Sequence, residues 1–208
     1  MSSCCRAGPC EQMFGPGVAR WDLRRYRKRG VGRVERRMLA SVTTRGLDPR
    51  ARVLVIGGGI GALQTELLLA GADRGEVVEL VAAYEPCARE LAEGAGLTGR
   101  TSFRVLDLLD EPEEARPADI VVLNRVVCCS ADGLDLTAAA ARLTRGTLLL
   151  SYPRDRWWIR LLSRTQNAAF WLVRRRFRSF VRPAGAIVGA AESEGLQVVD
   201  SGRGPVWE

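Results

Sequence analysis

The residues whose spacing best suits ligand binding are four closely spaced glycines: Gly57, Gly58, Gly59 and Gly61. They follow the apolar run 53–56, which is typical of a strand buried on both faces of a parallel sheet. Residues 62–70 then have helical character. Glycines let such a turn close tightly and let a ligand approach the backbone without a Cβ in the way. Because the following helix also offers free N–H groups, this strand–turn–helix unit predicts a site for a nucleotide-like ligand.

An acidic residue stands where such a unit places its ribose contact. Glu79 belongs to the predicted strand 76–80 and lies 22 residues after Gly57. A βαβ nucleotide site holds the acid that accepts hydrogen bonds from the ribose hydroxyls at about this spacing. The spacing favours a ligand-binding role over that of an exposed glutamate at a strand end.

Polar residues also follow the next two predicted strands. Asp107 comes directly after the strand 101–106, and Asn124 and Arg125 come after the strand 119–123. Ligands of open parallel sheets bind beyond the carboxyl ends of the strands. We therefore expect these side chains to lie beside the glycine turn.

The alternation of strands and helices predicts an α/β fold, a doubly wound and mostly parallel sheet flanked by helices. We expect an N-terminal arm and helical cap over residues 1–46 and a Rossmann-like domain over residues 47–208. Within the arm, residues 1–16 are expected to form a loop. The predicted strands are 52–56, 76–80, 101–106, 119–123, 147–152 and 196–200, with a short edge strand at 206–207. The predicted helices are 18–29, 33–44, 62–70, 85–95, 136–143 and 183–195.

The composition suits a single folded domain. The chain has 208 residues, 47% of them hydrophobic, and shows neither a signal peptide nor an apolar run of about 18 residues. We therefore expect a cytoplasmic protein with reduced thiols. The net charge is +7, but the arginines are spread along the chain and no nucleic-acid-binding motif is visible, so we expect no nucleic-acid partner. Because the chain has no histidine, histidine triads, histidine bases and histidine metal ligands are excluded.

Cysteines occur in two groups that matter for the chemistry. Cys4, Cys5 and Cys10 lack the paired C-x-x-C spacing of a zinc site, and no histidine completes a ligand set. Cys128 and Cys129 follow the fourth predicted strand, where two small buried thiols are favoured over a nucleophile or a soft-metal site. We predict no metal site.

A basic and aromatic helical insertion is expected at about 154–181. Its tryptophans, leucines and phenylalanines are mixed with arginines, as in amphipathic helices. The favoured interpretation is a helix packed on the sheet. The alternatives are a cap over an apolar substrate pocket and a peripheral membrane contact through Trp157–Phe177.

The glycine turn, Glu79 and Asp107 together resemble the class I S-adenosylmethionine-dependent methyltransferases, over about residues 52–200. The resemblance implies that the turn cradles the methionine part of the cofactor, Glu79 takes the ribose hydroxyls, and Asp107 reaches the adenine amino group. Val55 departs from the pattern, because the family usually has an acid at this position. The residues implied to bind the cofactor S-adenosyl-L-methionine are Gly57, Gly58, Gly59, Gly61, Glu79, Leu80, Asp107, Leu108 and Asn124.

Two narrower resemblances concern the substrate. The whole length resembles short bacterial methyltransferases of unassigned substrate, through the N-terminal cysteines, residues 20–29, 124–129 and 151–154. The helix that carries Trp21 and Tyr26, with the run after the fourth strand, is similar to magnesium-protoporphyrin O-methyltransferases. That similarity implies methylation of a carboxylate oxygen on a flat, apolar molecule.

The implied reaction is an in-line displacement on a small-molecule methyl acceptor, in which the protein mainly aligns the reactants in a dry pocket. Tyr26, Tyr152 or a carboxylate is the candidate general base for an acceptor that arrives protonated. Arg125, with Arg25 as an alternative, is the candidate that orients a carboxylate acceptor.

Two other functions fit part of the sequence. Gly57-x-Gly59-x-x-Ala62, together with Val55, also matches the dinucleotide fingerprint of NAD- and flavin-dependent oxidoreductases. A catalytically inactive, cofactor-binding partner protein is the remaining alternative.

Overall fold

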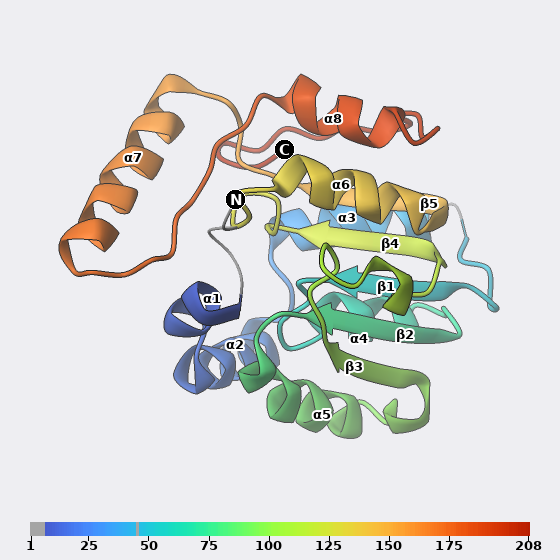
Figure 1. The fold of residues 1–208 in the computed structure, drawn as a ribbon. Helices are drawn as coiled ribbons and strands as arrows, with labels where there is room; N and C mark the ends of the chain where they lie inside the picture. Colours follow the sequence, from blue (N-terminus) through green and yellow to red (C-terminus); the bar gives the residue numbers. More distant parts are fainter. Residues whose placement is uncertain (1–6, 45) are drawn as a thin grey trace.

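A computed structural model describes residues 7–44 and 46–208 of the chain. These residues fold around one parallel sheet (Figure 1). The sheet has five strands in the order β3-β2-β1-β4-β5, and all neighbouring pairs are parallel. The strands are β1 (Arg52–Ile56), β2 (Arg74–Glu79), β3 (Thr101–Val105), β4 (Ala118–Asn124) and β5 (Thr144–Ser151). This order confirms the predicted doubly wound α/β fold.

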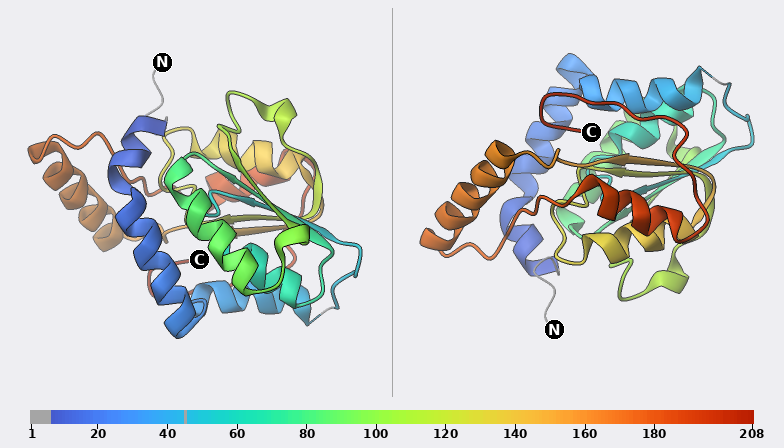
Figure 2. Two further views of the ribbon diagram at one scale, coloured as in Figure 1. Left: turned by 90° about the horizontal axis from the view of Figure 1, so that it is seen from below. Right: turned by 90° about the horizontal axis from the view of Figure 1, so that it is seen from above.

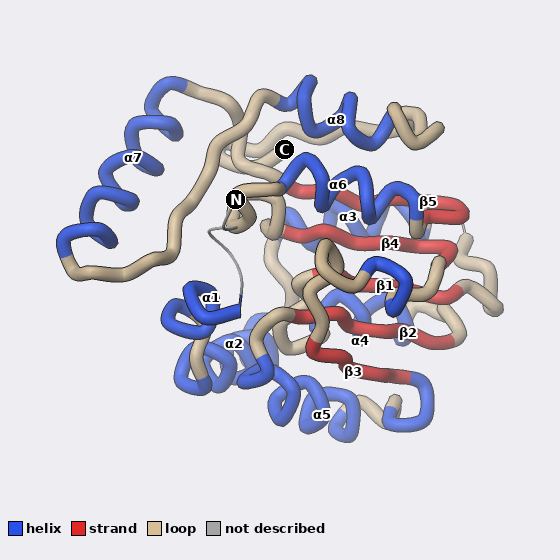
Figure 3. The backbone as a smooth tube through the Cα atoms, in the orientation of Figure 1, coloured by secondary structure: helices blue, strands red, loops and turns tan. Residues whose placement is uncertain are grey.

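Helices lie on both faces of this sheet (Figure 3). The α-helices are α1 (Ala7–Met13), α2 (Pro16–Arg29), α3 (Arg33–Thr43), α4 (Ala62–Leu69), α5 (Glu85–Gly94), α6 (Gly133–Arg142), α7 (Trp157–Leu172) and α8 (Ala184–Glu192). The short 3-10 helices are η1 (Ala82–Tyr84), η2 (Thr98–Arg100) and η3 (Pro112–Glu114). Apart from α1, each of these α-helices lies in a region that was predicted to be helical.

Alternate residues of the central strands enter two separate cores. Leu54 and Ile56 of β1 pack in the core beneath α6 and α8, whereas Val53 and Val55 pack in the core beneath α3 and α4. Successive side chains of a strand point to opposite faces, so one apolar run fills both cores. This two-sided burial is the reason that β1 and β4 read as continuous apolar runs in the sequence.

The N-terminal arm is more ordered than predicted. Residues 7–13 form α1, so the loop expected over residues 1–16 is wrong there, and Cys4 and Cys5 lie outside the described residues. Cys10 of α1 is buried in a third core with Leu23 of α2 and Tyr84. A helix of seven residues is marginal by itself. Its stability comes from this packing, which neighbouring glycines and prolines conceal in the sequence.

The predicted sixth strand is wrong. Residues 196–200 are not part of the sheet, and Val198 and Val199 are exposed. Strands of a parallel sheet need cover on both faces, whereas these two valines are 57% and 69% exposed. The chain instead crosses α3, where Arg37 donates to the Ser201 carbonyl, and pairs antiparallel with the segment after β5 through Pro153 and Trp207. The short edge strand expected at 206–207 is therefore present as a single bridge.

Helix α7 stands away from the sheet, beside the rest of the molecule (Figures 1 and 2). Of its described residues, only Ile159 is buried. The interpretation of this segment as a helix packed on the sheet is therefore wrong. Across residues 7–44 and 46–208, no helix has the length and apolar character needed to cross a membrane.

The glycine turn after β1 gives a test of the fold. Gly57 has a φ of 62°, and a Cβ added to it would lie 2.5 Å from Cγ2 of Val126. Gly30 has a φ of 63°, but a Cβ added there meets nothing within 4 Å. We expect Gly30→Ala to lower the free energy of unfolding by about 1–3 kcal/mol, the cost of placing a Cβ on a backbone with a φ of 63° and a ψ of −160°, a region that glycine almost alone occupies. Gly57→Ala should cost about 1–3 kcal/mol more because of the clash.

Urea denaturation of the two variants measures this difference. Equal losses of stability would show that Val126 moves aside without cost, and that the turn is not closely packed against the segment after β4.

Candidate active site

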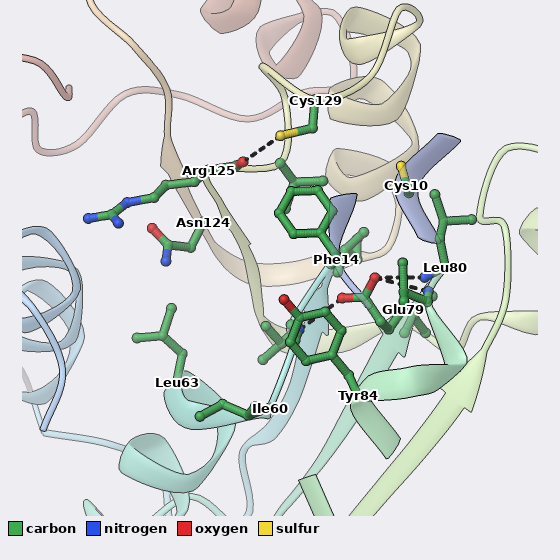
Figure 4. A pocket seen from close by; sticks show the side chains of 18 of the residues that line it. Cys10, Phe14, Ile60, Leu63, Glu79, Leu80, Tyr84, Asn124, Arg125 and Cys129 are labelled. Atoms are coloured by element: carbon green, nitrogen blue, oxygen red, sulfur yellow. Dashed lines mark hydrogen bonds between the residues drawn. The ribbon is translucent and has the colours of Figure 1, made fainter. Parts of the chain in front are cut away.

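A cavity of about 400 Å³ lies at the carboxyl ends of β1, β2, β3 and β4 (Figure 4). Residues from α1, α2 and α3 cover it from the other side. Its lining includes most of the predicted cofactor residues: Gly57, Gly58, Gly59, Glu79, Leu80, Asp107, Leu108 and Asn124. Of the predicted catalytic residues, Tyr26 and Arg125 also line the cavity. Strand ends far apart in the sequence thus meet around one space, as expected for this sheet.

The glycine turn forms the floor of the cavity on the β1 side. Gly57 and Gly59 have left-handed φ angles of 62° and 54°, and the Gly57 N–H donates to the Val78 carbonyl at 2.7 Å. Gly61, with a φ of 74°, precedes the first residue of α4 and does not belong to the cavity lining. The turn therefore presents backbone to the cavity at positions 57–59, while Gly61 serves the start of the helix.

Glu79 ties the end of β2 to this turn. One carboxylate oxygen accepts a hydrogen bond from the Gly59 N–H at 2.9 Å, and the other accepts from Leu80 and Val81 at 2.9 and 3.2 Å. The residue is 9% exposed. Burial raises the pKa of the carboxyl, while the three backbone N–H groups act in the opposite direction. A carboxylate held in this way keeps further lone pairs for hydroxyl donors in the cavity.

Asp107 and Leu108 lie next to Glu79 along the same edge of the sheet. One oxygen of Asp107 accepts a hydrogen bond from the Leu109 N–H at 3.0 Å, and the residue is half-buried. Leu108 is buried in the core beneath α6 and α8. The cavity wall here combines a carboxylate with an apolar side chain, which suits a polar, flat ring.

A polar network crosses the end of β4. The Asn124 amide donates to Glu35 of α3 at 3.2 Å, and the Ser151 hydroxyl donates to the Asn124 carbonyl oxygen at 2.7 Å. The Arg125 guanidinium lies 3.1 Å from the same Glu35 oxygen and 4.9 Å from the ring of Trp207. Figure 4 shows the Arg125 side chain directed away from Glu79. Arg125 also has a φ of 61°, an unusual conformation for a residue with a Cβ.

Two atoms of this network have no hydrogen-bond partner within residues 7–44 and 46–208. They are Oε2 of Glu35 and Nε of Arg125, and both are buried. Buried polar atoms are rarely left without a partner, so an acceptor and a donor that both lack one in the same network point to a ligand. The sequence analysis missed Glu35, because the helix that carries it precedes the glycine turn and no motif marks it.

The two candidate tyrosine bases do not fit that role. The Tyr26 hydroxyl donates to Glu66 at 2.8 Å, and burial together with this carboxylate raises the tyrosine pKa. Tyr152 lies outside the cavity lining, in the core beneath α6 and α8, and burial raises its pKa as well. A phenol with a raised pKa is a weaker proton acceptor at neutral pH, because its phenolate is rarer. Arg125 reaches the cavity, but Glu35 and Trp207 already engage its guanidinium.

Three further cavity residues were also missed. Phe14 follows α1, and the Tyr84 hydroxyl donates to Asp22 of α2 at 3.1 Å. Burial raises the pKa of the Asp22 carboxyl, which the tyrosine and Arg25 partly offset. Tyr84 lies five residues after Glu79, at the end of η1, and its place beyond the carboxyl end of β2 was a usable signal.

Cys128 and Cys129 follow β4, and one of them reaches the cavity. The sulfur atoms of Cys128 and Cys129 are 3.7 Å apart, and Cys129 lines the cavity, as does Cys10 from α1. The hydrogen bond with Cys129, and to a smaller extent the charges of Arg182 and Arg125, lower the pKa of the Cys128 thiol. Among the residues that the structure describes, no group of three or more cysteine and acidic residues is placed to hold a metal ion.

Comparison with known proteins identifies the fold. No protein-family model matches the sequence, and a search of curated proteins finds no match. Solved structures do match. Magnesium protoporphyrin IX methyltransferase from Synechocystis PCC 6803 with bound SAH superimposes with a TM-score of 0.70 and 18% identity, over 98% of this chain and 96% of that protein.

Two larger proteins are also similar. An O-methyltransferase family protein from Burkholderia thailandensis gives a TM-score of 0.67 at 21% identity, over 94% of this chain. An O-methyltransferase family 2 protein from Planctomyces limnophilus, in complex with apigenin, gives 0.62 at 20% identity, over 92% of this chain. This chain spans 59% and 60% of their lengths, respectively. The resemblance found in the sequence is thereby confirmed at the level of structure: the chain has the Rossmann-like fold of class I S-adenosylmethionine-dependent methyltransferases.

Proposed function

We propose that the protein is a cytoplasmic S-adenosylmethionine-dependent methyltransferase that acts on a small, apolar or carboxylate-bearing molecule. One observation carries the proposal: the glycine turn, Glu79 and Asp107 line a single cavity in a fold shared with such enzymes. Cys87 is a buried thiol without a disulfide, which supports a reducing compartment.

The cavity fits the nucleoside part of this cofactor. Glu79 presents a buried carboxylate that the Gly59 N–H holds in place, which suits two ribose hydroxyl donors. Asp107 follows one strand further along, with its second oxygen available for an amino group, and Leu108 offers an apolar surface to a ring. We assign the ribose to Glu79 and the adenine to Asp107 and Leu108.

The orphaned pair at the end of β4 fits the amino-acid part. The methionine end of the cofactor carries an ammonium donor and a carboxylate acceptor. Oε2 of Glu35 and Nε of Arg125 are the complementary acceptor and donor. Val55 is buried in the core beneath α3 and α4 and brings no acid to this site. We assign the methionine end to Glu35 and Arg125, so that α3 supplies the carboxylate that the turn motif lacks.

The cofactor, when bound, supplies a methyl group on a sulfonium, which is already activated for in-line displacement. The chain then has to align the acceptor and exclude water. Phe14 and Ile60 give the cavity apolar walls, and Arg25 of α2 adds a cation to its lining. A carboxylate acceptor needs no base, and Arg25 is the cation that we assign to orient it, since Glu35 engages Arg125.

Three of the solved neighbours support an oxygen acceptor. Two of them are described as O-methyltransferases, and the third acts on magnesium protoporphyrin IX. The raised pKa of Tyr26 supports an acceptor that is already anionic, because no described tyrosine of the cavity is a good base. We therefore propose O-methylation of a carboxylate as the reaction.

Calorimetry tests the cofactor assignment. We expect the chain to bind S-adenosylmethionine and S-adenosylhomocysteine with measurable heat and to give none with NAD, because NAD shares the adenosine but has an anionic pyrophosphate where these ligands have the ammonium that we assign to Glu35. Binding of NAD without binding of S-adenosylmethionine would contradict the methyltransferase proposal and favour an NAD-dependent oxidoreductase. S-adenosylhomocysteine binding without methyl transfer to any carboxylic acid would favour an inactive, cofactor-binding protein.

Substitution of Glu79 tests the ribose contact. Glu79→Gln should weaken S-adenosylhomocysteine binding about 10- to 100-fold, the scale of about 1–3 kcal/mol for a buried, charged hydrogen-bond partner. Glu76→Gln is the control, because Glu76 lies on the same strand, pairs with Arg104 and does not line the cavity. If the two folded variants bind alike, Glu79 does not belong to the site.

The raised pKa of Glu79 gives a pH test. The carboxylate accepts hydrogen bonds most strongly when ionised, and burial shifts its protonation to a higher pH than that of an ordinary glutamate. Affinity for S-adenosylhomocysteine should therefore fall as the pH is lowered through this raised pKa. The Glu79→Gln variant should lack that step. Parallel curves for both proteins would assign the titration to another group.

A further inference from the structure

Helix α7 exposes an unusual amount of apolar surface. Its first and last turns leave large side chains in solvent: Trp157 is 76% exposed, Trp171 71% and Leu172 76%. Leu161 and Leu162 between them are more than half exposed. Exposed single apolar residues are common, but a whole helix of them marks an interaction surface.

The helix is nevertheless held firmly in place. Asn167 exchanges two hydrogen bonds with the backbone of Ser179, both 2.8 Å long, and the hydroxyls of Ser163 and Ser179 are 2.9 Å apart. The returning segment therefore covers one side of α7 and fixes its orientation. The apolar side chains on the remaining surface stay exposed because of this geometry, not because the helix lacks structure.

The charge of the protein is concentrated on the same segment. Residues 154–178 hold eight arginines and one aspartate, a formal charge of +7, which equals the net charge of the whole chain. The arginines found elsewhere are balanced by acidic residues. Asp155 is itself paired with Arg160. The rest of the molecule is thus neutral overall, and its long-range attraction for anions comes from this segment.

We propose that residues 154–178, the α7 segment, dock the protein on the surface of an anionic membrane. Exposed tryptophans and leucines flanked by arginines are the composition of helices that lie in the lipid headgroup region. Nucleic acid satisfies the charge but offers no apolar layer for Leu161, Leu162 and Leu172. The helix has 16 residues and lies on the surface of the bilayer rather than crossing it.

The α7 segment is connected to the cavity by aromatic contacts. Phe170 of α7 meets Phe177 edge to face at a centroid distance of 5.8 Å, and Phe177 meets Phe14 at 5.4 Å. Phe14 lines the cavity. Docking therefore places a cavity wall near the lipid surface. Given the proposed function, this position suits an apolar acceptor that is dissolved in the membrane.

Vesicle co-sedimentation of the full chain tests the docking. We expect binding to vesicles of phosphatidylcholine mixed with phosphatidylglycerol, weaker binding as salt is added, and none to phosphatidylcholine alone. Failure to pellet with the anionic vesicles at low salt would overturn the proposal. Docking does not depend on methyl transfer, so this result and the calorimetry fail separately.

Removal of the apolar side chains separates docking from simple charge attraction. The double variant Trp171→Ser and Leu172→Ser should bind anionic vesicles at least about tenfold more weakly, because its apolar insertion is lost. The control is Trp21→Ser with Leu69→Ser, which changes two residues of similar type, 60% and 61% exposed, on α2 and α4. Equal binding of both variants would overturn the role of α7.

Removal of positive charge from the α7 segment is a second test of the docking. Exchange of Arg164, Arg174 and Arg176 for glutamine should weaken vesicle binding about a hundredfold, since each arginine near the surface adds attraction. All three side chains are exposed, so circular dichroism should stay unchanged.

The matched control exchanges Arg29, Arg33 and Arg36, which are also exposed, for glutamine. The same loss in this control would show that net charge, and not the α7 segment, decides the binding. A DNA duplex that binds the chain more tightly than anionic vesicles, with no effect of the Trp171 and Leu172 exchange, would favour nucleic acid and overturn the lipid proposal.

Discussion

The hydrogen bond from the Gly59 N–H to the buried Glu79 carboxylate is the interaction on which the site depends. A carboxylate loses hydration when it is buried, and it stays at the end of β2 because three backbone N–H groups replace that water. The same bond fixes the glycine turn relative to the neighbouring strand. Cavity shape, turn geometry and carboxylate position are therefore one arrangement, and each is lost if another changes.

The parts of the structure that depend on local pattern were predictable from the sequence. β1 and β4 are buried on both faces, so their apolar runs identify them, and the glycines that follow β1 mark the turn. Elements whose stability comes from distant contacts were not. α1 packs Cys10 against α2 and Tyr84, and residues 196–200 lie outside the sheet, with Val198 and Val199 more than half exposed. Neither fact leaves a periodic trace in the sequence.

The site shows the same division. Glu79, Asp107 and Asn124 were predictable because strand ends in a parallel sheet meet at one edge. Glu35 was not, because α3 reaches this edge through tertiary packing alone. Residue type was also a poor guide: the Tyr26 hydroxyl lies at the cavity, but it donates a hydrogen bond to Glu66, and burial together with this carboxylate raises the tyrosine pKa. Position in the fold is therefore easier to predict than protonation, which depends on each neighbour.

The α7 segment forms an ordered amphipathic helix without burying the apolar side of that helix. An amphipathic helix of a globular protein hides its apolar side in the core, yet here that side stays in solvent while hydrogen bonds to Ser179 hold the helix. Exposed tryptophan and leucine reduce solubility, whereas a local charge of +7 opposes self-association by repulsion. The arginines thus keep the free protein dispersed, and an anionic surface removes the repulsion. In the proposed docking, apolar contact then becomes favourable where lipid is present.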